Sequence, residues 1–352
     1  MPILSIYVGE SQISVLEYTS GADFKFATYP YVFPYEIYQD GFNSEKFYTQ
    51  VLRHLGKTEG IDIEADPILL GTVTGVAPAI KHTYNFSVHE ALSSVESYSW
   101  TLVENFVVMN ERNMSSFYPM KKDLTFSQPN MVNYLSNKSL YPHIAPSSPD
   151  TFKSEDVLSK NLSASMGASV ATEQPMIFTG GRFAHFDENS VASYLLALDL
   201  LRTPGVFNVR IDPSNKLPLI GLLNTYLQSN EASDSGQEPA DIDEAFEDEF
   251  VTLGTVLNSP GGAEILFEME AGNSQFVDIK PNRLFIFPLE KTSSARIVVE
   301  GKSIGHMEKN VRGGSLGFVI DTRDQTASDF LTTSSTQHSE WVKVINERIK
   351  AF

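Results

Sequence analysis

The chain has 352 residues, no cysteine, and a formal net charge of −18 that results from 44 acidic and 26 basic residues. This length suits two or three domains, and a hydrophobic fraction of 41% is ample for burying their cores. The acidic balance disfavours nucleic acid and anionic membranes as partners, because phosphate binding needs clustered lysines and arginines. The lack of cysteine excludes disulfides, thiolate chemistry and cysteine-based zinc sites.

The beginning of the sequence and its hydropathy indicate where we expect the protein to reside. Residues 1–6 lead directly into a strand-like pattern, without the charged start and apolar core of a signal peptide. No apolar run approaches the roughly 20 residues of a membrane helix. We therefore expect a cytoplasmic protein that does not insert into membranes.

Strand and helix patterns alternate in the first part of the chain. Residues 3–18 predict two short strands around a turn at Gly9. Apolar residues at helical spacing predict a helix over 47–55, which Gly56 can end. A continuous apolar run then predicts a buried strand over 68–76. Alternation of this kind favours an α/β layer architecture.

The middle of the chain is less regular before the alternation returns. Residues 88–104 look helical, and the stretch 121–160, rich in Ser, Pro, Asn and Lys, predicts an irregular surface excursion. The next predicted elements are a strand over 175–181 that ends in Gly180 and Gly181, a helix over 188–202, a strand over 206–211 and a helix over 217–227. Asn189 or Ser190 can cap the first of these helices.

Composition changes sharply after the last of these helices. Residues 231–249 contain nine acidic and no basic residues, which is typical of a solvated linker. Beyond it, short apolar runs separated by turn residues predict an all-β sandwich or barrel over 250–325. The predicted organisation is two α/β halves over 1–100 and 101–230, the linker, the all-β domain, and a tail with a C-terminal helix over 326–352.

Three stretches, in order along the chain, resemble one family. They are a strand, a glycine turn and an Ala-His pair over 177–185, a Leu-Pro-rich helix over 217–223, and Gly-Gly…Gly-Phe-Val-Ile-Asp-Thr-Arg over 313–323 before a tryptophan-bearing helix. Together they resemble the actin-like ATPases, and among them the MutL-type proteins associated with glutamate mutase. The resemblance implies two ribonuclease-H-like halves that clamp a nucleotide. The expected fold class is therefore α/β, with an actin-like duplicated ribonuclease-H-like body followed by a C-terminal all-β, sandwich-like domain.

The first phosphate loop of that family would run Asp-x-Gly-Ser-x-x-x-Lys. Its glycine lets backbone amides approach phosphate oxygens, and its aspartate holds hydrated magnesium. The matching residues are 7–14, in which Gly9 is retained, Tyr7 replaces the aspartate, and Glu10 would point a negative charge at the phosphates.

The second loop would run Val-Asp-x-Gly-Gly-x-Thr-Thr-Asp, and its best match is 108–116. Met109 replaces the first aspartate, Glu111 and Arg112 replace the glycines, and Ser116 replaces the last aspartate. On this match magnesium and phosphate have lost their ligands at both loops. We therefore expect no catalytic residue, no metal and no cofactor. The alternative is that Gly9, Gly180 and Gly181 still hold ATP or ADP in a degenerate cleft.

Other candidate chemistry is disfavoured. The seven histidines include no pair at the spacing of a helical metal site, and no Gly-x-Ser-x-Gly occurs. The acidic segment 241–244 lacks the glycine and distal glutamate of a calcium loop. The glycines of 260–262 and 313–314 could bind phosphate through their amides, but we interpret them as hairpin turns. We interpret His185, beside the glycine turn, as structural.

Three functions remain open from the sequence. We expect a non-hydrolysing actin-like scaffold or adaptor, a pseudo-ATPase that acts through a protein partner or by self-assembly. The first alternative is an ATP-dependent chaperone for a cobalamin-dependent mutase, in which Glu10, Glu17 or Glu111 would replace the missing aspartates. The second is a self-assembling structural protein, because actin-like bodies polymerise readily.

Overall fold

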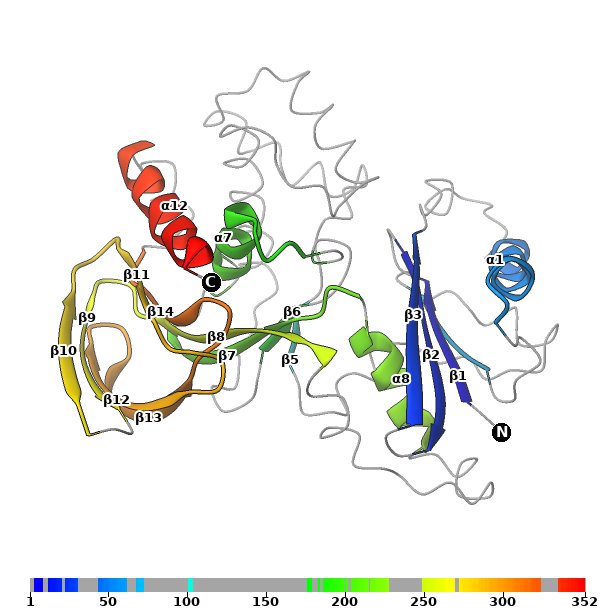
Figure 1. Ribbon diagram of the computed structural model, residues 1–352, viewed down its shortest axis with the longest axis horizontal. Helices are drawn as coiled ribbons and strands as arrows, with labels where there is room; N and C mark the ends of the chain where they lie inside the picture. The colour runs from blue at the N-terminus through cyan, green and yellow to red at the C-terminus, as the bar shows by residue number, and fades with distance from the viewer. Residues whose placement is uncertain are drawn as a thin grey trace.

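The computed structural model has mixed α/β content and places its described strands in three sheets (Figure 1). The structure describes residues 3–8, 12–20, 23–30, 44–61, 68–72, 101–103, 176–178, 183, 186–199, 201, 204–214, 216–227, 249–269, 272–323 and 335–351.

The first sheet has four strands in the order β3-β2-β1-β4. They are β1 (Ile3–Val8), β2 (Gln12–Ser20), β3 (Asp23–Pro30) and β4 (Ile68–Thr72). The strands β1, β2 and β3 form an antiparallel meander, and β4 runs parallel to β1. A parallel neighbour requires a crossover connection, and helix α1 (Ser44–Thr58) lies in that connection.

Both faces of the first sheet are covered, which explains why β1 is buried along its whole length. Successive side chains of a strand point to opposite faces. Ile6 and Val8 therefore pack with α1, whereas Ile3 and Tyr7 pack with α8 (Lys216–Leu227). The result is a helix–sheet–helix arrangement in which α8, which follows the second sheet in sequence, completes the first one.

The second sheet has six strands in the order β11-β14-β8-β7-β6-β5. They are β5 (Thr101–Val103), β6 (Met176–Phe178), β7 (Gly205–Ile211), β8 (Val251–Asn258), β11 (Leu284–Phe287) and β14 (Gly317–Asp321). The strands β5, β6 and β7 are parallel, β8 is antiparallel to β7, and β14 is parallel to β8. Helices α7 (Val191–Asp199) and α12 (Ser335–Lys350) cover one face, into which α12 inserts Trp341 and Ile345.

The third sheet covers the opposite face of the second, because Val206 and Phe318 pack with it while their neighbours Phe207 and Val319 pack with the helices. Its order is β10-β9-β12-β13, and every neighbouring pair is antiparallel. The strands are β9 (Ala263–Met269), β10 (Ser274–Ile279), β12 (Ser294–Gly301) and β13 (Gly305–Arg312). The two sheets therefore share one apolar core (Figure 1).

Most predicted strands and helices are found near their expected positions, and the exceptions have physical reasons. The edge strands β3 and β13 were not predicted, because they are only partly buried and their apolar alternation is weak.

Two helix predictions differ from the structure. The helix predicted over 88–104 is wrong at its end, where Thr101–Val103 forms a strand that pairs in parallel with β6. The rest of that predicted helix lies outside the described residues. Helix α1 continues past Gly56, and Gly60, with φ of +68°, follows its end instead.

The predicted separate all-β domain over 250–325 is not confirmed. Three strands of that range, β8, β11 and β14, extend the sheet that β5, β6 and β7 begin, and β8 pairs directly with β7. The acidic linker thus falls between two neighbouring strands of one sheet. The duplication of a ribonuclease-H-like half is also not confirmed by the described residues. The irregular excursion 121–160 and residues 231–248 of the linker lie outside them.

Candidate nucleotide cleft

A buried carboxylate holds the turn between β7 and α8. Asp212 directly follows β7, and its side chain is fully buried. Its Oδ1 accepts backbone N–H bonds from Ser214 at 3.3 Å and Lys216 at 2.9 Å, and its Oδ2 accepts one from Leu217 at 2.8 Å. The first N–H groups of a helix have no partner within the helix. Asp212 therefore caps α8 and places a negative charge at the positive end of its dipole.

This capped turn links the end of β6 to the neighbourhood of the β1–β2 turn. The backbone N–H of Asp212 donates to the carbonyl oxygen of Phe178, the last residue of β6, at 2.8 Å. On the other side, Ser14 Oγ of β2 donates to the carbonyl oxygen of Ser214 at 2.6 Å. The end of β6, which precedes Gly180 in sequence, and the start of β2, which follows Gly9, are therefore joined through residues 212–214.

The predicted binding residues themselves are not placed by the structure. Those that lie outside the described residues are Gly9, Glu10, Gly180, Gly181, His185 and the loop 108–116. Their roles stay predictions. Among the described residues, the end of β6 and the start of β2 both bond to the turn 212–214.

Tyr7 occupies the position at which the resemblance implies a magnesium-binding aspartate. Its side chain is 6% exposed and belongs to an apolar cluster with Leu217 and Tyr226 of α8 and with Phe250. In the first sheet it lies opposite Ser14 of β2. A phenol packed in an apolar core offers no carboxylate to hydrated magnesium, so this position serves the packing of α8.

Polar groups on the α8-facing side of β1 and β2 fix how the helix sits. Ser5 Oγ donates to the carbonyl oxygen of Leu219 at 3.1 Å. The amide nitrogen of Gln12 lies 3.4 Å from Ser14 Oγ, within hydrogen-bond distance. The amide oxygen of Gln12 is buried and has no hydrogen-bond partner among the described residues. These contacts tie the strands on both sides of the β1–β2 turn to α8 and its cap.

Lys216, the first residue of α8, is engaged within the protein. Its ammonium group forms an ion pair with the carboxylate of Glu249 and lies 3.5 Å from the carbonyl oxygen of the same residue. It also lies 4.9 Å from the centre of the Phe26 ring, within the range of a cation–π interaction. A phosphate group at this turn would have to displace Glu249 in order to pair with the ammonium group of Lys216.

Glu17 does not lie in the cleft. Its neighbours Leu16 and Tyr18 pack with α8, so Glu17 points to the opposite face of the first sheet, where it is exposed. It also pairs with Leu4, at the far end of β1 from the turn at Gly9. Of the three glutamates that could replace a missing aspartate, this one is therefore badly placed.

The other two glycine segments serve backbone packing. Residues 260–262 connect β8 to β9, and 313–314 connect β13 to β14, so each joins strands of different sheets. The interpretation of both as hairpin turns is therefore wrong. The N–H of Gly313 donates to the carbonyl oxygen of Ser293 at 3.1 Å, and the N–H of Gly262 donates to that of Ser259 at 3.2 Å. These two amides are thus occupied by protein acceptors.

Within the ranges that the structure describes, no group of three or more His, Asp or Glu side chains is placed to hold a metal ion. None of the helices in those ranges has the length and apolar composition needed to cross a membrane.

Sequence reasoning missed Asp212, although the sequence contains a usable pattern. Asp212 follows a β-branched and apolar strand and precedes a helix that carries Pro218 in its first turn. An aspartate in that place is a common helix cap. The pattern does not show that the carboxylate is buried, because burial depends on the tertiary structure and not on the local sequence.

We expect Asp212→Ala to lower the free energy of unfolding by about 2 kcal/mol, because three backbone N–H groups would lose their acceptor in a buried turn. Urea denaturation followed by circular dichroism measures the change. Asp187→Ala is the matched control, since Asp187 accepts one N–H bond, from Asn189, at an exposed turn. Equal losses in the two variants would contradict the role assigned to Asp212.

Comparisons with known proteins give little further information. No protein-family model matches the chain, and no curated protein matches it. Among solved structures, the chain is similar to the type II variant of the Ppx/GppA phosphatase of Aquifex aeolicus, with 9% sequence identity and a TM-score of 0.29. The similarity covers 70% of this chain and 87% of that one. A superposition this loose neither assigns the fold nor transfers an activity.

Proposed function

We propose that this protein is a non-hydrolysing scaffold or adaptor built on an actin-like body. The observation that carries the proposal is the state of Tyr7, a core residue at the place where a hydrolysing relative would need an aspartate. Loss of this carboxylate removes a magnesium ligand from the first loop. The proposed adaptor therefore keeps the architecture of a nucleotide cleft but not the magnesium ligand that hydrolysis needs.

The electrostatics of the β7–α8 turn support the same proposal. The N-terminus of a helix commonly binds anions through its free N–H groups. In α8 the N–H groups of Lys216 and Leu217 are already bonded to Asp212. A phosphate approaching this turn would meet the carboxylates of Asp212 and Glu249, and the resulting repulsion disfavours nucleotide binding.

We expect the wild-type protein to show no magnesium-dependent ATP hydrolysis above buffer and no rise in melting temperature with ATP or ADP. A ligand that binds the folded state raises its stability by mass action, so thermal shift measurements with and without magnesium detect binding even without turnover. Gly181→Val should lower the melting temperature equally with and without nucleotide, because we expect this glycine to form a tight turn into the following helix.

A nucleotide-dependent rise in melting temperature that Gly181→Val abolishes would overturn the proposal. It would favour the alternative of an ATP-dependent chaperone for a cobalamin-dependent mutase, which needs a functional nucleotide site. Sedimentation velocity over a concentration series separates an adaptor from the third candidate. A self-assembling structural protein should form larger species as the concentration rises, whereas a monomeric adaptor should not.

A further inference from the structure

The outer face of the third sheet, which points away from the second sheet, carries an apolar row across three strands. Phe276 of β10 is 63% exposed. It pairs with Leu266 of β9, which in turn pairs with Val298 of β12, and both of these are partly exposed. Side chains directly opposite each other in a sheet are in contact range. The three residues therefore form a continuous apolar strip that starts at the edge of the sheet.

The strand that begins this strip is open to pairing. Among the described strands, β10 is the first of its sheet and pairs on one side only, with β9. Its sequence, SQFVDI, has no proline and no bulge, and its one charged residue, Asp278, is paired with Lys280. Edge strands without such protection pair readily with another chain. The exposed side chain of Phe276 therefore belongs to a strand whose outer edge has no pairing strand among those described.

An acidic row runs beside the apolar strip. Asp278 of β10 pairs with Glu264 of β9, and Glu264 pairs with Glu300 of β12. Like charges directly opposite each other destabilise a sheet. Lys280 forms an ion pair with Asp278, and His306 bonds to Glu300, which raises the pKa of His306 above its usual 6.5. Glu264, at the centre of the row, has no ion pair among the described residues.

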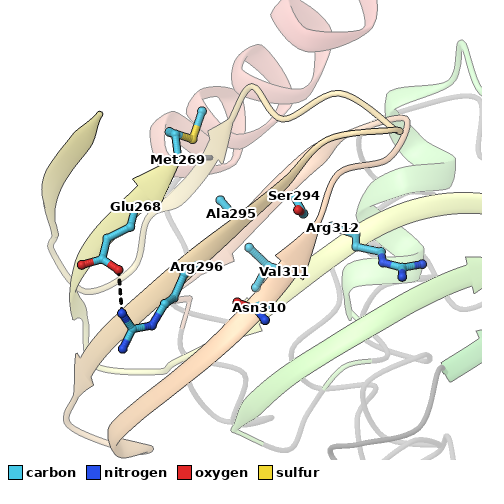
Figure 2. Close-up of a pocket in the computed structure, with 8 residues that line it drawn as sticks. All are labelled: Glu268, Met269, Ser294, Ala295, Arg296, Asn310, Val311 and Arg312. Carbon is cyan, nitrogen blue, oxygen red and sulfur yellow. Dashed lines mark hydrogen bonds and ion pairs between the residues drawn. The ribbon is translucent and has the colours of Figure 1, made fainter. Parts of the chain in front are cut away.

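On the other side of the strip the charges are balanced. Arg296 reaches Glu268 (Figure 2). Both side chains line a hollow of about 520 Å³. Arg296 bonds to Glu268 at 2.8 Å and to Glu308 at 2.5 Å, and its single positive charge offsets one of these two negative charges. Arg312 adds a further positive side chain to the lining of the hollow. The excess negative charge of the outer face therefore lies on the row through Glu264.

We propose that this face binds an extended, basic segment of a protein partner, which adds to the third sheet as a strand beside β10. An apolar side chain of that segment would cover Phe276, and a Lys or Arg two residues away would lie beside Asp278 and Glu264. Strand addition supplies main-chain hydrogen bonds, and alternate side chains supply specificity. A second copy of this chain is a poor occupant, because each copy carries a net charge of −18.

This inference rests on the proposed adaptor function for its biological meaning, but its test does not involve nucleotide. The probe is a short fluorescein-labelled peptide that carries Lys, Phe and Lys at alternate positions, and its counterpart carries Glu in place of Lys. Fluorescence anisotropy with the full chain measures binding. We expect the Lys peptide to bind at least about tenfold more tightly than the Glu peptide, by charge complementarity.

Three variants test the position of the site. Phe276→Ser should weaken binding of the Lys peptide at least about tenfold. Glu264→Lys should also weaken it and should improve binding of the Glu peptide. Glu347→Lys, on the exposed side of α12, changes the same charge elsewhere and should have no effect. The variants alter exposed or partly exposed side chains, so the fold should be retained.

Two outcomes would overturn the inference. The first is equal binding, or no binding, of the Lys and Glu peptides by the wild-type protein. The second is a wild-type dimer that Phe276→Ser dissociates in sedimentation experiments, which would make a second copy the occupant. Neither outcome bears on ATP hydrolysis, so failure of this inference and failure of the pseudo-ATPase proposal are distinguishable.

Discussion

Replacing Gly254 by alanine should lower the free energy of unfolding by more than about 3 kcal/mol. Gly254 of β8 lies beside Gly317 of β14 in a parallel ladder and has a φ of +124°. A Cβ atom at this position would lie 2.1 Å from the carbonyl oxygen of Gly317. Since both groups belong to the backbone of neighbouring strands, the clash cannot be relieved by a side-chain rotation. Chemical denaturation of the purified variant measures the loss.

Gly305→Ala is the control for this experiment. Gly305 also has a positive φ, of +67°, but an added Cβ atom would meet nothing within 4 Å. Its substitution should cost only about 1 kcal/mol, from the left-handed backbone conformation. A similar loss in the two variants would show that the close approach of β8 and β14 contributes nothing beyond backbone strain.

The second large effect is expected at a buried ion pair near the end of β14. Arg323 binds Asp321 through two parallel bonds, Nε to Oδ1 at 2.9 Å and Nη2 to Oδ2 at 2.6 Å. The two side chains are 3% and 2% exposed, and the guanidinium group lies 5.0 Å from the centre of the Trp341 ring of α12. Asp321→Ala would leave a buried positive charge, so we expect a loss of about 3–5 kcal/mol in the free energy of unfolding.

Two further variants separate charge burial from the loss of a contact. Replacing both partners, as Asp321→Leu with Arg323→Met, should recover much of the stability, because no buried charge remains unpaired. Glu340→Ala removes an ion pair with Arg283 that also connects α12 to the second sheet, but both of its side chains are about half exposed. Its loss should be below about 1 kcal/mol. If Glu340→Ala costs as much as Asp321→Ala, burial is not the cause.

The residues of these two predictions lie in or beside the stretch 313–323, which carries part of the family resemblance. Within 313–323, glycines let the backbone pass close to β8, and the Asp-Thr-Arg ending holds α12 on the sheet through its tryptophan. Both features stabilise the fold. The described contacts of this stretch are therefore those of strand packing and helix attachment.

The sequence by itself was sufficient for most individual strands and helices. The apolar runs of β1, β4 and β7 and the helical spacing in α1 are local patterns, and burial of β1 on both faces makes its run continuous. That Tyr7 replaces an aspartate follows only from the match to the family's first loop and stays a prediction. The strands β3 and β13 were missed, because an edge strand buries too little to impose a regular alternation.

Tertiary structure alone decided which strands share a sheet. Turn residues and short apolar runs look the same whether consecutive strands pair or separate, so the sequence could not show that β8 and β9 belong to different sheets. It also could not show that Asp212 is buried, that the turn after it bonds to Ser14 near the other end of the chain, or that Tyr7 packs on α8. Such contacts join residues far apart in sequence, and their energies depend on the three-dimensional arrangement rather than on local composition.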